Sequence, residues 1–141
     1  MWLGRIGSPG SQAPDCTVSS SSQVASIRMV RVPASQENAG EVAAILRREI
    51  SWSAFLGRAR QHGVLPLVYR YVKVQDQLPI PGHVVEQLRE HYLSNSRRNL
   101  VKTAILIRIL QRLEQEGILA IPYKGPTLAV MAYGDLGLRE F

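Results

Sequence analysis

The chain has 141 residues, 45% of them hydrophobic, which predicts about one globular domain with a modest core. The net charge of +6 favours an anionic partner, namely a nucleotide, a nucleic acid or a membrane surface. Aromatic residues make up only 6%, which argues against a base-stacking platform for single-stranded nucleic acid.

The cysteine content and the hydropathy exclude several further classes. The single cysteine, Cys16, excludes an internal disulfide framework and any multi-cysteine zinc site, so we expect a reducing, cytoplasmic setting. The N-terminal residues "MWLGRIGSPGSQ" are interrupted by glycine and proline too early for a secretory signal. No apolar stretch approaches the ~18 residues of a membrane span, so no membrane partner is expected.

Residues 1–40 differ in composition from the rest of the chain. They are rich in Ser, Gly, Gln and Pro, as in "SPGSQAP" and "TVSSSSQ", and their apolar residues show no helical or strand period. Such a segment buries too little apolar surface to offset the entropy lost on ordering. We therefore predict that residues 1–40 are disordered or form a non-native extension.

From residue 41 the pattern becomes helical, and we predict a helical region over residues 41–116. Ser51 is expected to cap a helix that Gly63 ends, and Pro66 suits the first turn of the next helix. Residues 83–116 form the longest run, which Gly117 stops. A break is conceivable at "SNSRRN", because Ser and Asn are poor helix formers. The predicted apolar stripe of this run comprises Val85, Leu88, Tyr92, Ser96, Leu100, Ala104, Ile107 and Leu110.

After Gly117 the sequence predicts a strand, a turn and a short helix. Residues 118–122, "ILAIP", are short, β-rich and bounded by glycine and proline, which predicts a strand. Pro126 suits the first position of a helix that Gly134 ends. The predicted fold class is therefore α+β, mainly α-helical, with a helical region followed by the first strand and helix of a sheet.

Few residues are candidates for chemistry. His62, His83 and His91 have no cysteine or carboxylate at a metal-like spacing, and the sequence has neither a Walker loop nor a dinucleotide-binding glycine motif. The predicted strand–turn–helix is the exception, because Gly125 lets a backbone approach a phosphate closely and Lys124 adds positive charge. On these residues alone, an ordinary β–α turn with a surface lysine stays open as the alternative.

Several segments together resemble a known family. They are Trp52, "ARQHGVLPLVYRYV" at 59–72, "SRRNL" at 96–100, "GILAIPYKGPTLA" at 117–129 and "YGDLGLREF" at 133–141. This set is similar to the uncharacterised nucleotidyltransferase family within the DNA polymerase β-like superfamily. The resemblance implies that Gly125 approaches a nucleoside triphosphate (NTP), that Lys124 is its charged neighbour and that Arg139 precedes the metal-binding acids. Residues 117–141 would then start the nucleotidyltransferase core.

The resemblance also implies what should follow these residues. In such families an Asp-x-Asp pair on a strand holds two Mg²⁺ ions, which activate an acceptor hydroxyl and the leaving pyrophosphate. Asp135 and Glu140 are the only acids nearby, and they lack the alternate spacing of paired strand carboxylates. We therefore expect an N-terminal portion of a nucleotidyltransferase that is cut short, with no catalytic or metal-binding residues, no bound Mg²⁺ and no transfer activity of its own.

Other readings stay open beside this one. One alternative is a non-enzymatic helical interaction module, whose partner would be a protein that supplies the missing half of the enzyme, and another is a degenerate fragment. These residues specify neither the acceptor nor the preferred NTP.

Overall fold

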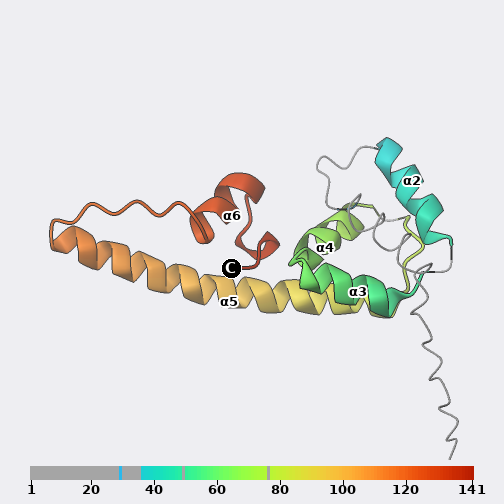
Figure 1. Ribbon diagram of the computed structural model, residues 1–141, viewed down its shortest axis with the longest axis horizontal. Coiled ribbons are helices and arrows are strands. Elements are labelled where there is room, and N and C mark those ends of the chain that lie inside the picture. The colour runs from blue at the N-terminus through green and yellow to red at the C-terminus, as the bar shows by residue number, and fades with distance from the viewer. Residues whose placement is uncertain (1–28, 30–35, 49, 76) are drawn as a thin grey trace, which may run out of the picture.

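The computed structural model describes residues 29, 36–48, 50–75 and 77–141 (Figure 1). Its helices are α2 (Gln36–Leu46), α3 (Trp52–Gln61), α4 (Leu65–Val74), α5 (Gly82–Gln115) and α6 (Pro126–Tyr133), followed by the 3₁₀ turn η1 (Leu136–Leu138). Helix α2 begins at Gln36, before the expected start at residue 41. Of residues 1–40, the structure describes only Met29 and residues 36–40. The disorder predicted for the others concerns residues outside the described ones.

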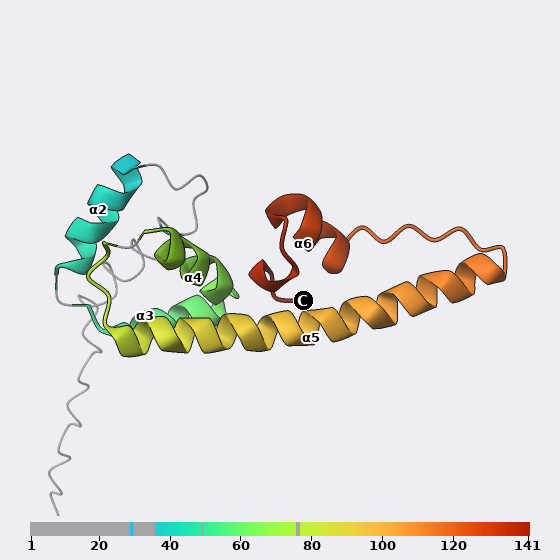
Figure 2. The ribbon, with the colours of Figure 1, turned by 180° about the vertical axis from the view of Figure 1, so that it is seen from behind.

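Helices α2, α3 and α4 gather around the N-terminal half of α5 and form what we call the helical head (Figures 1 and 2). Its core is aliphatic and aromatic. The buried members are Met29, Val42, Leu46, Phe55, Ala59, Leu65, Val68, Tyr71, Val84 and Leu88. The apolar faces of α2, α3, α4 and the N-terminal half of α5 thus bury one another, as the helical periodicity predicts.

The predicted helix ends of the head are confirmed. Ser51 is the N-cap of α3, and its side chain accepts a hydrogen bond from the Ala54 N–H at 3.4 Å. Gly63 follows α3 with φ of 64°, a left-handed conformation that glycine adopts without steric cost. Pro66 lies in the first turn of α4, where its missing N–H would have had no helical partner.

Helix α5 is the longest of the described helices. It runs through 34 residues, about 50 Å, without a break at "SNSRRN". Its buried residues are Val84, Leu88, Asn95 and Asn99, so the covered side becomes polar halfway along. The predicted stripe is therefore wrong at Leu100 and Ile107, which are 59% and 49% exposed, and at the exposed Ala104. No helix of the described residues, α5 included, is both long and apolar enough to cross a membrane.

The strand predicted over residues 118–122 is not formed. The described residues are mainly helical and contain no strand, so the predicted start of a sheet is not shown. Residues 118–123 instead run as an extended connection from the end of α5 back to α6 (Figures 1 and 2). The physical reason is that a strand is defined by hydrogen bonds to a neighbouring strand, and local β-propensity supplies none.

Candidate functional site

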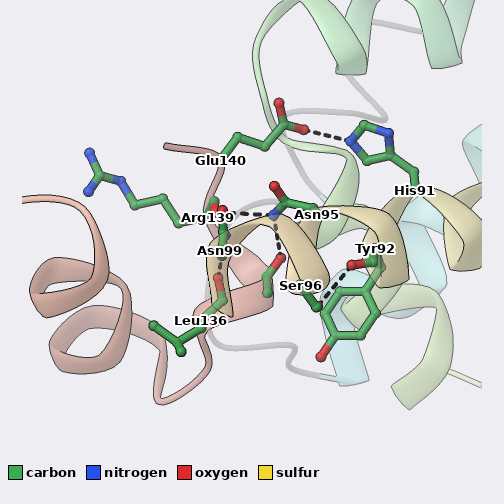
Figure 3. A network of polar contacts seen from close by, with 9 residues as sticks. His91, Tyr92, Asn95, Ser96, Asn99, Leu136, Arg139 and Glu140 are labelled. Carbon is green, nitrogen blue, oxygen red and sulfur yellow. Dashed lines mark hydrogen bonds and ion pairs between the residues drawn. The ribbon is translucent and has the colours of Figure 1, made fainter. Parts of the chain in front are cut away.

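The last residues of the chain are fixed to α5 by two buried asparagines (Figure 3). We call residues 135–141 the C-terminal segment. The Asn95 Nδ2 donates to the carbonyls of Gly137 and Arg139 at 2.8 and 3.1 Å. The Asn99 Nδ2 donates to the carbonyls of Leu136 and Arg139, both at 2.7 Å. Since each amide bridges two carbonyls, the backbone of the segment has a defined register along the helix.

Gly137 permits this close approach. A Cβ built at Gly137 would lie 2.7 Å from the Cε2 of Tyr92 and would overlap the Oγ of Ser96, which donates to the Tyr92 carbonyl. Only a residue without a side chain lets the segment backbone reach the asparagine amides. The glycine within "DLGLREF" therefore has a packing role.

Asp135, the first residue of the C-terminal segment, is hydrogen-bonded to Tyr92 on α5. The Tyr92 hydroxyl donates to Asp135 Oδ2 at 2.7 Å, while Asp135 Oδ1 accepts from the Gly137 N–H at 2.7 Å. The hydrogen bond to Asp135 is the largest cause that raises the pKa of Tyr92 above the ordinary 10.0, followed by burial and by the negative charge of Asp135. Both carboxylate oxygens are thus engaged within the protein.

We expect alkaline pH to weaken this contact. The folded chain holds the Tyr92 proton more tightly than the unfolded chain, so the stabilisation is complete below pH 10.0 and is lost as the pH rises through the raised pKa. Urea unfolding across this range should show a smaller loss of stability in Tyr92→Phe than in the wild type. Tyr123→Phe is the control, because Tyr123 is exposed. Equal losses in wild type and Tyr92→Phe would contradict this assignment.

The segment's last residues also have partners on α5. The Nε2 of His91 lies 2.7 Å from Glu140 Oε1, and the Lys102 ammonium donates to the Phe141 carbonyl. Asp135 and Glu140, the acids nearest the expected metal motif, are therefore occupied by Tyr92, Gly137 and His91. The described side chains contain no group of three or more His, Cys, Asp or Glu that could hold a metal ion. These residues do not fit a Mg²⁺ pair.

The turn before α6 combines a glycine of positive φ with the start of a helix. Gly125 is the N-cap of α6 with φ of 59° and ψ of −124°, a conformation open essentially to glycine, and Pro126 begins the helix. The first N–H groups of a helix have no partners within it and point outward from its start. Lys124 is exposed, with its ammonium 5.4 Å from the centroid of the Tyr123 ring.

Arg139 is the third predicted residue. Its backbone carbonyl receives both asparagine amides, and Figure 3 shows its guanidinium pointing away from Asn95. The Nη1 of Arg139 is buried, and it has no hydrogen-bond partner within the described part of the chain. A Cβ on Gly125 would lie 3.7 Å from the Phe141 ring, so the turn and the C-terminal segment are neighbours. The structure thus brings Gly125 against the segment that carries Arg139, while Lys124 faces solvent.

Sequence reasoning missed the asparagine pair. "SNSRRN" suggested a weak point of the helix, whereas Asn95 and Asn99 are the least exposed polar residues described, at 1% and 0%. Their four-residue spacing, in line with Leu88 on the covered side of α5, was the available signal. A polar pair on an otherwise apolar face indicates buried partners, because buried polar groups are hydrogen-bonded.

The fold and the site define a helical scaffold that carries a turn at Gly125, the start of α6 and two positively charged side chains, Lys124 and Arg139. Residues 48–141 match the profile of a family described as uncharacterised nucleotidyltransferase. The match spans well over half of the chain, so the chain belongs to this family. No curated protein and no solved structure matches it.

Proposed function

We propose that this chain binds the phosphates of an NTP between the turn at Lys124 and Gly125 and the guanidinium of Arg139, for transfer of a nucleotidyl group to an acceptor hydroxyl. Membership of the nucleotidyltransferase family supports the class of reaction. The observation that carries the proposed site is the buried Nη1 of Arg139 without a partner among the described residues. A buried charged donor is costly unless an acceptor satisfies it, and a phosphate oxygen is such an acceptor.

Each residue has a distinct part in this proposal. Gly125 allows the backbone to approach the phosphates, and the start of α6 directs its N–H groups and positive dipole end toward them. Arg139, whose main-chain carbonyl accepts from Asn95 and Asn99, contributes the donors of its guanidinium. Lys124 contributes a mobile point charge.

For the described residues, the proposal covers the binding and the orientation of the nucleotide for this transfer. The resemblance implies Mg²⁺ in complete family members, where it would stabilise charge on the phosphates. Because Asp135 and Glu140 already have partners within the protein, we assign no metal-dependent step to the described residues.

Lys124→Ala should weaken NTP binding by roughly 1–3 kcal/mol, the range for a hydrogen bond to a charged group. Equilibrium dialysis with a labelled NTP measures the change. Lys73→Ala is the matched control, because Lys73 is also exposed but lies in the last turn of α4. Equal affinities for Lys124→Ala and the wild type would remove Lys124 from the site.

A further inference from the structure

Residues 118–123, which we call the extended segment, have the side-chain pattern of a strand. Leu119, Ile121 and Tyr123 are 90%, 79% and 73% exposed, while the two residues between them are half-buried. From Leu119 to Tyr123 this alternation has the period of two that a strand produces, while Ile118 is 53% exposed. The segment therefore has the side-chain pattern for pairing with a strand, although the described residues contain no strand beside it.

The two edges of the extended segment differ, because the first has one available N–H group, that of Ala120, and the second has three. On one edge, the Ile118 N–H already donates to the Leu113 carbonyl at 2.9 Å, and Pro122 has no N–H. The opposite edge carries the N–H groups of Leu119, Ile121 and Tyr123, and no backbone hydrogen bond between described residues uses them. A partner strand can therefore form a regular ladder along this second edge alone.

The charges at the two ends of the segment are opposite. Glu116 lies just before it, at the C-cap of α5, and Lys124 lies just after it. An antiparallel copy of the same segment brings the acidic end of each chain to the basic end of the other. With Ala120 opposite Ala120, Leu119 and Ile121 exchange both backbone hydrogen bonds. Lys124 then lies near the partner's α5 end, where Glu116 is the C-cap and also pairs with Arg112 at 2.8 Å. Pro122 then lies at a position where no N–H is needed.

We propose that two copies of this chain associate through antiparallel pairing of their extended segments in this register. The interface is isologous, so each favourable contact occurs twice. Pairing satisfies the unused edge and covers Leu119 and Ile121, two of the most exposed aliphatic residues described. The self-complementary order of charges favours a second copy over an unrelated protein. Lys124 belongs to both this interface and the proposed nucleotide site, whereas Leu119 and Ile121 belong to the interface alone.

The test is the association state of the full chain in sedimentation equilibrium over a range of concentrations. The wild type should dimerise. Ile121→Pro removes one paired N–H from each chain and should weaken the dimer about 100-fold, since each lost hydrogen bond of ordinary strength corresponds to about a tenfold change. Ala120→Pro is the matched control, because the Ala120 N–H points away from the partner, and its dimer should persist.

Charge reversal tests the register. Glu116→Lys and Lys124→Glu should each weaken the dimer several-fold, and the double variant should restore it, because each reversal opposes like charges at both ends. Three results would overturn the proposal: a monomer at every concentration, equal weakening by both proline variants, or no rescue in the double variant. NTP affinity measured in Ile121→Pro separates this result from the nucleotide site, which that change leaves intact.

Discussion

The double variant Asn95→Leu, Asn99→Leu is expected to release the C-terminal segment from α5. Leucine is close to asparagine in size but donates no hydrogen bond, so the carbonyls of Leu136, Gly137 and Arg139 lose their donors. A buried carbonyl without a donor costs roughly 1–3 kcal/mol. The expected loss is about 3–6 kcal/mol in total, limited at the upper end because the freed carbonyls can reach water. Amide hydrogen exchange at Gly137 and Leu138 should become correspondingly faster.

The control for this variant is Ser94→Leu, because Ser94 is exposed and lies beside Asn95 in the same helix. It should leave exchange in the C-terminal segment unchanged. If the double variant also left that exchange unchanged, the asparagine amides would not hold the segment, and the fixed position of Arg139 would need another cause.

Gly125→Val is expected to weaken NTP binding by about 200-fold or more, which exceeds the roughly 1–3 kcal/mol expected for Lys124→Ala. Two causes act together. The backbone of Gly125 has a positive φ that a β-branched residue avoids, and the added side chain blocks the approach of the phosphates. Calorimetric titration with an NTP measures the loss, and circular dichroism reports whether the helices persist.

Gly117→Val separates the two causes. Gly117 also has a positive φ, of 73°, so valine strains its backbone as well, but Gly117 precedes the extended segment whereas the turn follows it. We expect Gly117→Val to lower stability by about 1–3 kcal/mol while NTP affinity is retained. Similar affinities in Gly125→Val and the wild type would exclude the turn as the phosphate site.

The features that the sequence predicts well are local ones. The N-cap at Ser51, the left-handed Gly63 and Gly117, and the helix start at Pro126 are set by neighbouring residues, so their chemistry can be read from the chain itself. The core of the helical head follows from the same logic, because helical periodicity gathers apolar residues on one face.

The features that the sequence did not predict depend on distant partners. Asn95 binds a carbonyl 42 residues later, so no local pattern tells whether this asparagine weakens a helix or anchors a segment. Residues 118–122 have strand composition and alternating exposure, but strand formation requires a partner, and local preference cannot provide one. The candidate site shows the same division, because Gly125 is recognisable from its turn, whereas the unsatisfied guanidinium of Arg139 is visible only in three dimensions.

The central claim is that the start of α6 and Arg139 bind the phosphates of an NTP, and an NMR titration of the labelled chain tests it most directly. Addition of an NTP should shift the backbone amides of Gly125 and Thr127 and the guanidinium N–H signals of Arg139, with one shared dissociation constant. Inorganic triphosphate should shift the same signals, because the proposed contacts are to phosphate. Shifts confined to other parts of the chain, or no saturable shift at all, would contradict the account.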